Sequence, residues 1–292
     1  TKKKNPLKRL LSMRGMGQVV TVTIGLIVLL VAFALINPNF WSPTNRTNLL
    51  RQIAPILIIG IAQSYVLITG NIDLSIGSVV GMSTMVAATL MSKGIMSPIP
   101  ALLVTLLCCL LIGVLNGLLV AKFKLPPFIA TLGTMTVARG IAQLVNGNYN
   151  TDSIMKFYPE AAQTFKNVFY YGKTLGLYNG IWIAIILWIV FNFLLSKTRT
   201  GRYIYATGSN IDAARLSGVN VVSTTVIAYV VSAFCSFVVG IITCATVGQG
   251  TMDAGNSYEM YAVAASVIGG VSTLGGQGIL LGTVVGAAIW GT

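Results

Sequence analysis

KTRTGRYIYATGSNIDAARLSGVN, residues Lys197–Asn220, is the longest strongly polar run after the N-terminal segment. It holds four basic residues against one acid, Asp212, and an apolar run long enough to cross a bilayer lies on each side of it. Within it, Asp212–Gly218 (DAARLSG) predicts a short helix that a glycine ends. A basic, structured loop between two spans indicates a docking site for another subunit, and the flanking spans indicate a membrane pathway.

The composition excludes a soluble protein. Only 9% of the 292 residues are charged, whereas a soluble domain carries roughly 25%. The net charge of +13 does not indicate a nucleic-acid partner, because the basic residues collect in short segments beside apolar runs. The chain lacks histidine, and its four cysteines lie inside apolar runs, so we expect no metal site. Phosphate-cradling, serine-hydrolase and zinc-protease motifs are missing, so we expect no enzyme activity and no cofactor in this chain.

The apolar runs predict an all-α integral membrane protein, a helical bundle with broken helices and about nine to ten spans in the full protein. We expect one transmembrane domain over residues 1–292, with a basic cytosolic segment at 1–18 and a cytosolic loop at 197–222. The predicted spans and shorter apolar pieces are Val19–Ile36, Ile53–Thr69, Ile76–Met91, Ala101–Ala121, Phe128–Val145, Ile181–Leu195, Thr225–Val247, Met260–Val271 and Ile279–Trp290. Polar loops are expected outside at Asn45–Gln52, Asn146–Gly180 and Gly248–Tyr258.

The basic residues predict the orientation. Twelve of them fall on the side that the span order assigns to the cytosol, and six fall outside. Cytosolic loops of membrane proteins carry the excess of lysine and arginine. We therefore expect a multi-pass protein, in contact with membrane lipid, whose N-terminus is cytosolic.

Two polar features interrupt the apolar runs. Gly70–Gly77 (GNIDLSIG) breaks a long apolar stretch, and a broken helix is tolerated where it lines a cavity or is buried in protein. Asp73 or Ser75 could cap the helix that begins near Ile76, or could lie on a substrate path. Arg139 lies within an apolar run, where a charge is costly. Three alternatives are open for Arg139: it belongs to a functional site, it pairs with carbonyl groups at a helix end, or its long side chain extends to the outer face of the membrane.

Glycine pairs at a spacing of four residues predict close helix packing. Small residues on one helical face let two backbones approach each other. The glycines concerned are Gly77 and Gly81, Gly113 and Gly117, and the row Gly278, Gly282 and Gly286.

Four collinear segments resemble one family, the simple-sugar permeases of bacterial ABC importers. This group includes the ribose, galactose, xylose and autoinducer-2 permeases. The segments are GNIDLSIG (70–77), PFIATLGTMTVARG (127–140), TRTGRYIYATGSNIDAARLSGV (198–219) and YEMYAVAASVIGGVSTLGGQG (258–278). The resemblance runs from about Phe40 to Gly291. Members of the family continue beyond that point, so we expect the C-terminus of this chain to be trimmed.

The resemblance implies a set of partners. Two permease subunits, identical or paralogous, form the pathway in the bacterial inner membrane. A cytosolic ATPase, usually two fused nucleotide-binding domains, binds ATP-Mg, and a periplasmic sugar-binding protein delivers the substrate. Asp212-Ala213-Ala214-x-x-x-Gly218 matches the Glu-Ala-Ala-x-x-x-Gly spacing of the family's ATPase-coupling segment, with aspartate in place of glutamate. Whether Asp212 makes the same contact stays open. The ATPase-coupling candidates are Arg199, Arg202, Gly208, Asn210, Asp212, Ala213, Ala214, Arg215, Ser217 and Gly218.

The resemblance also implies transport by alternating access. A neutral sugar calls for hydroxyl, amide and aromatic groups along its path, although each such residue alone more often serves helix packing. The translocation-path candidates are Ser64, Tyr65, Asp73, Ser75, Asn116, Thr131, Thr134 and Arg139. The alternatives are an ABC importer for autoinducer-2, a nucleoside or a vitamin, and an ion-coupled secondary carrier, which would need a coupling carboxylate.

Overall fold

The computed structural model describes residues 16–292, and the part of the expected cytosolic segment at 1–15 lies outside the described residues. The regular elements of the described part are helices, apart from one hairpin of two-residue strands, which confirms the all-α prediction. Its elements, in order, are α2 (Met16–Ile36), α3 (Pro43–Ile68), α4 (Ile76–Ser92), α5 (Pro98–Ala121), α6 (Pro127–Leu144), α7 (Pro159–Lys166), η1 (Asn167–Tyr171), β1 (Lys173–Thr174), β2 (Leu177–Tyr178), α8 (Asn179–Lys197), α9 (Arg199–Ser209), α10 (Ile211–Leu216), α11 (Val221–Val247), α12 (Tyr258–Ile268) and α13 (Leu280–Gly291).

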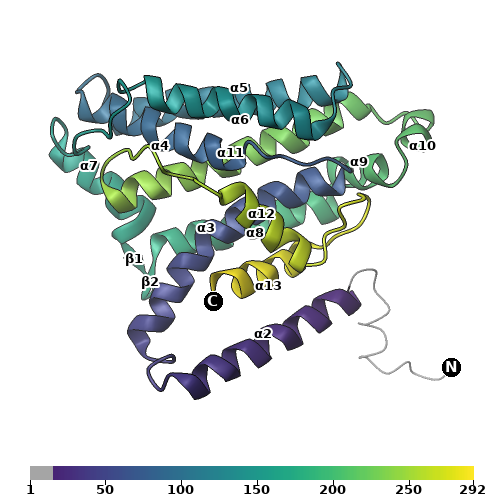
Figure 1. Ribbon diagram of the computed structural model, residues 1–292, viewed down its shortest axis with the longest axis horizontal. Coiled ribbons are helices and arrows are strands. Elements are labelled where there is room, and N and C mark those ends of the chain that lie inside the picture. Colours follow the sequence, from purple (N-terminus) through teal and green to yellow (C-terminus); the bar gives the residue numbers. More distant parts are fainter. Residues whose placement is uncertain (1–15) are drawn as a thin grey trace.

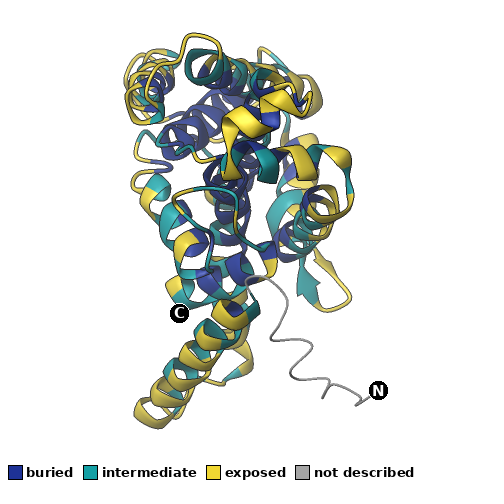
Figure 2. Ribbon diagram, turned by 90° about the vertical axis from the view of Figure 1, so that its right-hand side faces the viewer, coloured by how far each residue is buried: buried dark blue, intermediate teal, exposed yellow. Residues whose placement is uncertain are grey.

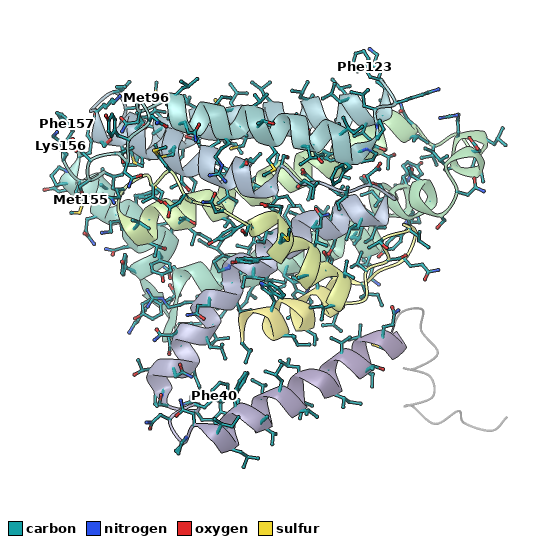
Figure 3. The ribbon with its side chains drawn as sticks, in the orientation of Figure 1. Phe40, Met96, Phe123, Met155, Lys156 and Phe157 are labelled. Atoms are coloured by element: carbon teal, nitrogen blue, oxygen red, sulfur yellow. The ribbon has the colours of Figure 1, made fainter. Side chains whose placement is uncertain are left out.

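The long helices run between two opposite ends of the molecule (Figure 1). One end carries α9 and α10, and we call it the α10 end; the other carries α7 and the β1–β2 hairpin, and we call it the hairpin end. In Figure 3, Phe123 lies at the α10 end, and Lys156 and Phe157 lie at the hairpin end. Helix α11 packs against α3, α4 and α5 in the core. Helix α2 projects from the body with most of its surface exposed (Figure 2), and it packs on α13.

Five described helices are long and apolar enough to cross a membrane, namely α2, α3, α5, α8 and α11, while α4, α12 and α13 are shorter apolar helices. Their boundaries follow the sequence. Proline occupies the first turn of α3, α5 and α6, where its missing N–H costs no hydrogen bond. Gly248, with φ of +78°, ends α11 in the left-handed conformation that glycine tolerates.

Two expected loops are more ordered than predicted. Residues 45–52 belong to α3, because Ser42 caps the helix by accepting from the Asn45 N–H and Pro43 begins it. The expected long outer loop, 146–180, contains α7, η1 and the hairpin. An apolar face stabilises this loop, since Ala162 and Phe165 of α7 are buried in a cluster with α11. On its exposed surface, Lys156 forms an ion pair with Asp152 and lowers the pKa of that carboxyl group.

The glycine pairs have different partners. Gly113 and Gly117 of α5 pack on α11, and a Cβ at Gly117 would lie 2.5 Å from Val226 Cα. Gly282 and Gly286 of α13 pack in the same way on α12 and the residue after it, as predicted.

The other glycines of these rows do not serve close packing along helices. Gly77 and Gly81 of α4 lie against the carbonyl groups of Gly255 and Ala254 in the loop after α11, and against the side chains of Glu259 (α12) and Arg139 (α6). Gly278 precedes α13 in the connecting loop. The spacing of Gly77 and Gly81 therefore predicted a close approach at α4, but it did not show that a loop, and not a helix backbone, makes this approach.

Candidate functional site

The break between α3 and α4 is held by a buried carboxylate. Oδ1 of Asp73 accepts from the Ser75 N–H at 2.9 Å and from the Ser75 hydroxyl at 2.6 Å. Oδ2 accepts from the Ser232 hydroxyl of α11 at 2.7 Å, and the Tyr229 hydroxyl donates to the Ile72 carbonyl at 3.0 Å. Asp73 is 2% exposed. The break is thus fixed to the central helix, and Asp73 bonds the backbone at the start of α4.

The same network continues through two more helices. The Asn116 side chain of α5 donates to Ser75 Oγ at 2.9 Å, and the Thr134 hydroxyl of α6 donates to Asn116 Oδ1 at 2.6 Å. Four of the eight path candidates therefore form one continuous hydrogen-bonded chain, together with Ser232, which the sequence analysis missed. Every member is buried, so the chain satisfies polar groups that would be costly in the core.

The hydroxyl groups of the other candidates are not part of this network, although the Thr131 carbonyl accepts from the Thr134 hydroxyl at 3.2 Å. Ser64 of α3 contacts Thr283 of α13 at 2.9 Å, and the Tyr65 hydroxyl donates to the Phe191 carbonyl of α8 at 2.7 Å. Thr131 donates to the carbonyl of Pro127 within its own helix. These three residues join pairs or turns of helices, and they do not line one common surface with Asp73.

Arg139 has a structural partner. Its Nη1 donates to the carbonyl oxygens of Met252 and Ala254, each at 3.0 Å, and so ties α6 to the loop that follows α11. Gly81 leaves room for this contact, because a Cβ there would lie 2.8 Å from Nη1. Of the alternatives for Arg139, the geometry matches pairing with carbonyl groups at the hairpin end.

Helices α9 and α10 form the outermost part of the α10 end (Figure 1). Asn210 caps α10 by accepting from the N–H groups of Asp212 and Ala213, and Gly218 follows with φ of +81°. The sequence therefore predicted the short helix and its glycine stop correctly. The candidate residues that are exposed here are Arg199, Arg202, Asn210, Asp212, Ala213, Arg215, Ser217 and Gly218.

The two alanines of the coupling candidates differ in exposure. The two alanines do not form a common slim face, because Ala214 is buried against Val219 and Val221 while Ala213 is exposed. The outward apolar side chain is instead Leu216, which is 90% exposed. Arg215 lies 3.6 Å from Asp212 and so has an exposed acid beside it in the same helix.

The α9–α10 segment meets the broken helix through backbone contacts. Gly208 lies directly on the carbonyl oxygen of Ile68, the last residue of α3, which accepts from the Gly276 N–H at 2.8 Å. A Cβ at Gly275 would lie 2.8 Å from both the Gly208 carbonyl oxygen and the Gly70 Cα. We call Gly70, Gly208, Gly275 and Gly276 the glycine contact. The sequence did not predict the glycine contact, because no local signal shows which distant backbone a glycine touches.

A cavity of about 750 Å³ opens beside the glycine contact at the α10 end. Residues from the break line it, among them Thr69 and Asn71, and so do Lys124 from the loop before α6 and Asn210 and Arg215 from α10. The cavity therefore lies between α10 and the start of the break that follows α3. A movement of α10 would change its shape.

Comparison with known proteins gives a consistent result. Residues 45–292 match the family of branched-chain amino acid transport system permease components. The ribose import permease RbsC of Haemophilus influenzae is 40% identical over 92% of this chain and 81% of its own length, and that of Bacillus subtilis is 35% identical over 95% and 84%. The galactofuranose transporter permease YtfT of Escherichia coli is 36% identical over 97% and 82%. No solved structure matches the chain.

Both comparisons agree with the helical bundle described above. One family model matches most of the chain, and the sequence is similar to permeases over most of their length. Such proteins are multi-pass membrane permeases, which are not themselves enzymes. The chain belongs to the transport-system permease family that includes the ribose import permeases.

Proposed function

We propose that this chain is the membrane-spanning subunit of an ATP-driven importer that carries a neutral simple sugar, a pentose or hexose such as ribose, across the bacterial inner membrane. The names of the relatives at 35–40% identity support the sugar. The chain binds no cofactor, and ATP-Mg is bound and hydrolysed by a partner ATPase. The chain converts the conformational change of that partner into alternating access.

The α10 end faces the cytosol in this proposal. Lys124, in the loop before α6, and Arg215 of α10 line the same cavity, and Arg199 and Arg202 of α9 are exposed. Such basic surfaces prefer the cytosolic side. The ATPase, with two nucleotide-binding domains, docks there. A periplasmic sugar-binding protein docks at the hairpin end, and a second permease copy or a paralogue completes the pathway within the lipid.

The glycine contact is the observation that carries the mechanism. Glycine backbones in direct contact leave no flexible side chain between them, so a displacement of α9 acts on the Ile68 carbonyl at once. Ile68 ends α3, and the break held by Asp73 follows. Movement of α10 with the ATPase is thereby transmitted to the helix ends at the core of the pathway.

An ion-coupled carrier is the alternative of another class. It would need a buried carboxylate that is free to titrate. All six acids of the chain lie among the described residues, and Asp73 is the one that is buried. Both of its oxygens accept hydrogen bonds from protein groups, which favours a structural role.

A matched pair of leucines tests the docking surface. Leu216 on α10 is 90% exposed, and Leu175 at the tip of the hairpin is 87% exposed. We expect Leu216→Glu to abolish co-purification of the ATPase in mild detergent and D-ribose uptake in cells, while Leu175→Glu retains both. Normal co-purification with the Leu216→Glu variant would contradict docking at α10.

A further inference from the structure

A second cavity, of about 560 Å³, lies at the hairpin end between α3, α11, α12 and α13. Its volume falls within the roughly 300–1,000 Å³ that small-molecule pockets occupy. It shares no residue with the Asp73 network or with the cavity beside α10. The side chains that matter here are Arg51, Gln52, Thr243, Tyr258, Tyr261 and Trp290.

Three aromatic rings form a continuous surface in this cavity. The ring centroids of Tyr258 and Tyr261 are 5.5 Å apart, and those of Tyr261 and Trp290 are 5.6 Å apart. The faces of aromatic rings carry partial negative charge and attract the slightly positive C–H groups of a ligand. A sugar ring presents such C–H groups on its face and hydroxyl groups at its rim, which is the chemistry that this surface fits.

Polar groups face the same space. The Arg51 guanidinium is stacked 4.3 Å from the Tyr170 ring centroid and 4.2 Å from that of Tyr178, and its Nε has no hydrogen-bond partner among the described residues. The Gln52 amide can both donate and accept, and the Thr243 hydroxyl, which donates to the Val239 carbonyl at 2.9 Å, can still accept. Stacking thus fixes a cationic donor at the rim of the cavity.

The charge of the lining selects between ligand classes. None of the described residues that line the cavity is acidic. An amino acid would bring an ammonium group and leave it without an opposite charge, which is unfavourable in a partly desolvated site. A neutral polyol has no such group, and its hydroxyls match Arg51, Gln52 and Thr243.

A further polar side chain lies deeper in the core on the same face of α3. Gln52, Ile56 and Gln63 lie on one face of α3 at 3.6 residues per turn, and Gln63 is about 10 Å deeper than Ile56. Gln63 is fully buried, and neither its Nε2 nor its Oε1 has a hydrogen-bond partner among the described residues. An unpaired buried amide is costly, so it calls for a partner that arrives from elsewhere.

We propose that the hairpin-end cavity is a binding site for a neutral monosaccharide, with Tyr258, Tyr261 and Trp290 stacking on its ring. Arg51, Gln52 and Thr243 bind its hydroxyl groups, and Gln63 is the next polar group that it meets on its way inward. This site rests on the proposed function, because it is the outer entrance of the sugar path.

Uptake of labelled D-ribose tests the site with the full-length protein and its partners in cells that lack other ribose transport. Tyr261→Leu and Trp290→Leu should each lower uptake at low D-ribose concentration by about tenfold. Tyr149→Leu, an exposed tyrosine of the same end that does not line the cavity, should leave it unchanged. Full uptake by both cavity variants would overturn the site while the proposed function stands. Uptake of L-leucine and not of D-ribose by the unaltered protein would overturn both.

Protection from a thiol reagent separates ligand contact from misfolding. Three native cysteines are buried, and Cys108 is partly exposed, so Cys108→Ala provides the background. In that background, D-ribose should slow labelling of Thr243→Cys in the assembled importer and leave the exposed Asp152→Cys unaffected. Equal labelling of Thr243→Cys with and without D-ribose would overturn the proposal.

Discussion

Substitution of Asp73 separates a structural anchor from a residue of the transport path. In Asp73→Ala, three donors lose their acceptor, namely the Ser75 N–H, the Ser75 hydroxyl and the Ser232 hydroxyl. The two hydroxyls can rotate towards other acceptors, whereas the backbone N–H cannot. In Asp73→Asn, the amide oxygen can still accept from Ser75, and the amide N–H₂ can donate to Ser232 Oγ.

The size of the effect follows from these contacts. A hydrogen bond to a charged group contributes about 1.5–3 kcal/mol, and an orphaned buried donor costs about 1–3 kcal/mol. We therefore expect Asp73→Ala to lower the free energy of unfolding by about 3 kcal/mol, and Asp73→Asn by about 1 kcal/mol. At about 2–4 °C per kcal/mol for a chain of this size, the alanine variant should melt about 6–12 °C lower.

Melting of the full-length protein in detergent can be followed with a thiol-reactive fluorescent dye. Cys109, Cys235 and Cys244 are buried and become reactive as the protein unfolds. We expect Asp73→Asn to keep a melting temperature within a few degrees of the unaltered protein and to retain much of its D-ribose uptake. Equal melting temperatures for the two variants, with complete loss of uptake in both, would refute the anchor and assign Asp73 to the path.

Two further predictions concern contacts between elements. Gly208→Ala inserts a methyl group against the Ile68 carbonyl, and such overpacking costs about 1–3 kcal/mol. We expect it to lower the amount of D-ribose transported per ATP hydrolysed by about tenfold. Gly117→Ala places its added Cβ in another crowded contact, 2.5 Å from Val226 Cα between α5 and α11, and should lower stability and leave this ratio unchanged. Arg139→Met removes two hydrogen bonds to the loop after α11, so hydrogen exchange of residues 248–257 should become faster. Unchanged exchange would show that other contacts hold the loop.

The spans were predictable because the bilayer imposes a length and a composition on them. Each predicted run from Val19 to Val247 corresponds to a helix, and the boundaries differ by a few residues except at α3, which begins at Pro43 and not at Ile53. The differences occur where proline and a capping residue extend a helix into polar sequence, as at Ser42 and Pro43. Hydropathy does not detect such helix caps, and it does not predict that the polar residues 146–180 form α7, η1 and the β1–β2 hairpin.

The candidate site was predictable only where its signal is local. The helix cap at Asn210 and the glycine stop at Gly218 lie within one short segment, so the α10 helix could be predicted from the sequence. Ser232 and the Gly208–Gly276 contact were missed, because a serine in an apolar run and a glycine in a loop become informative only through partners far away in sequence. The tertiary packing of distant segments determines these partners, and a single segment of sequence does not predict that packing.

Helix α3 joins the two ends of the proposed mechanism. Its 26 residues extend over about 39 Å, with Gln52 in the hairpin-end cavity and Ile68 in the glycine contact. A shift of Ile68 that moves α3 as a rigid rod must therefore alter the cavity. Spin labels on Gln52→Cys and Val247→Cys, in a background without native cysteines, should change their separation when a non-hydrolysable ATP analogue binds the assembled importer. Because the signal passes through the glycine contact, Gly208→Ala should abolish this change and Gly117→Ala should preserve it. An identical change in both variants would mean that the two ends communicate by another route than α3.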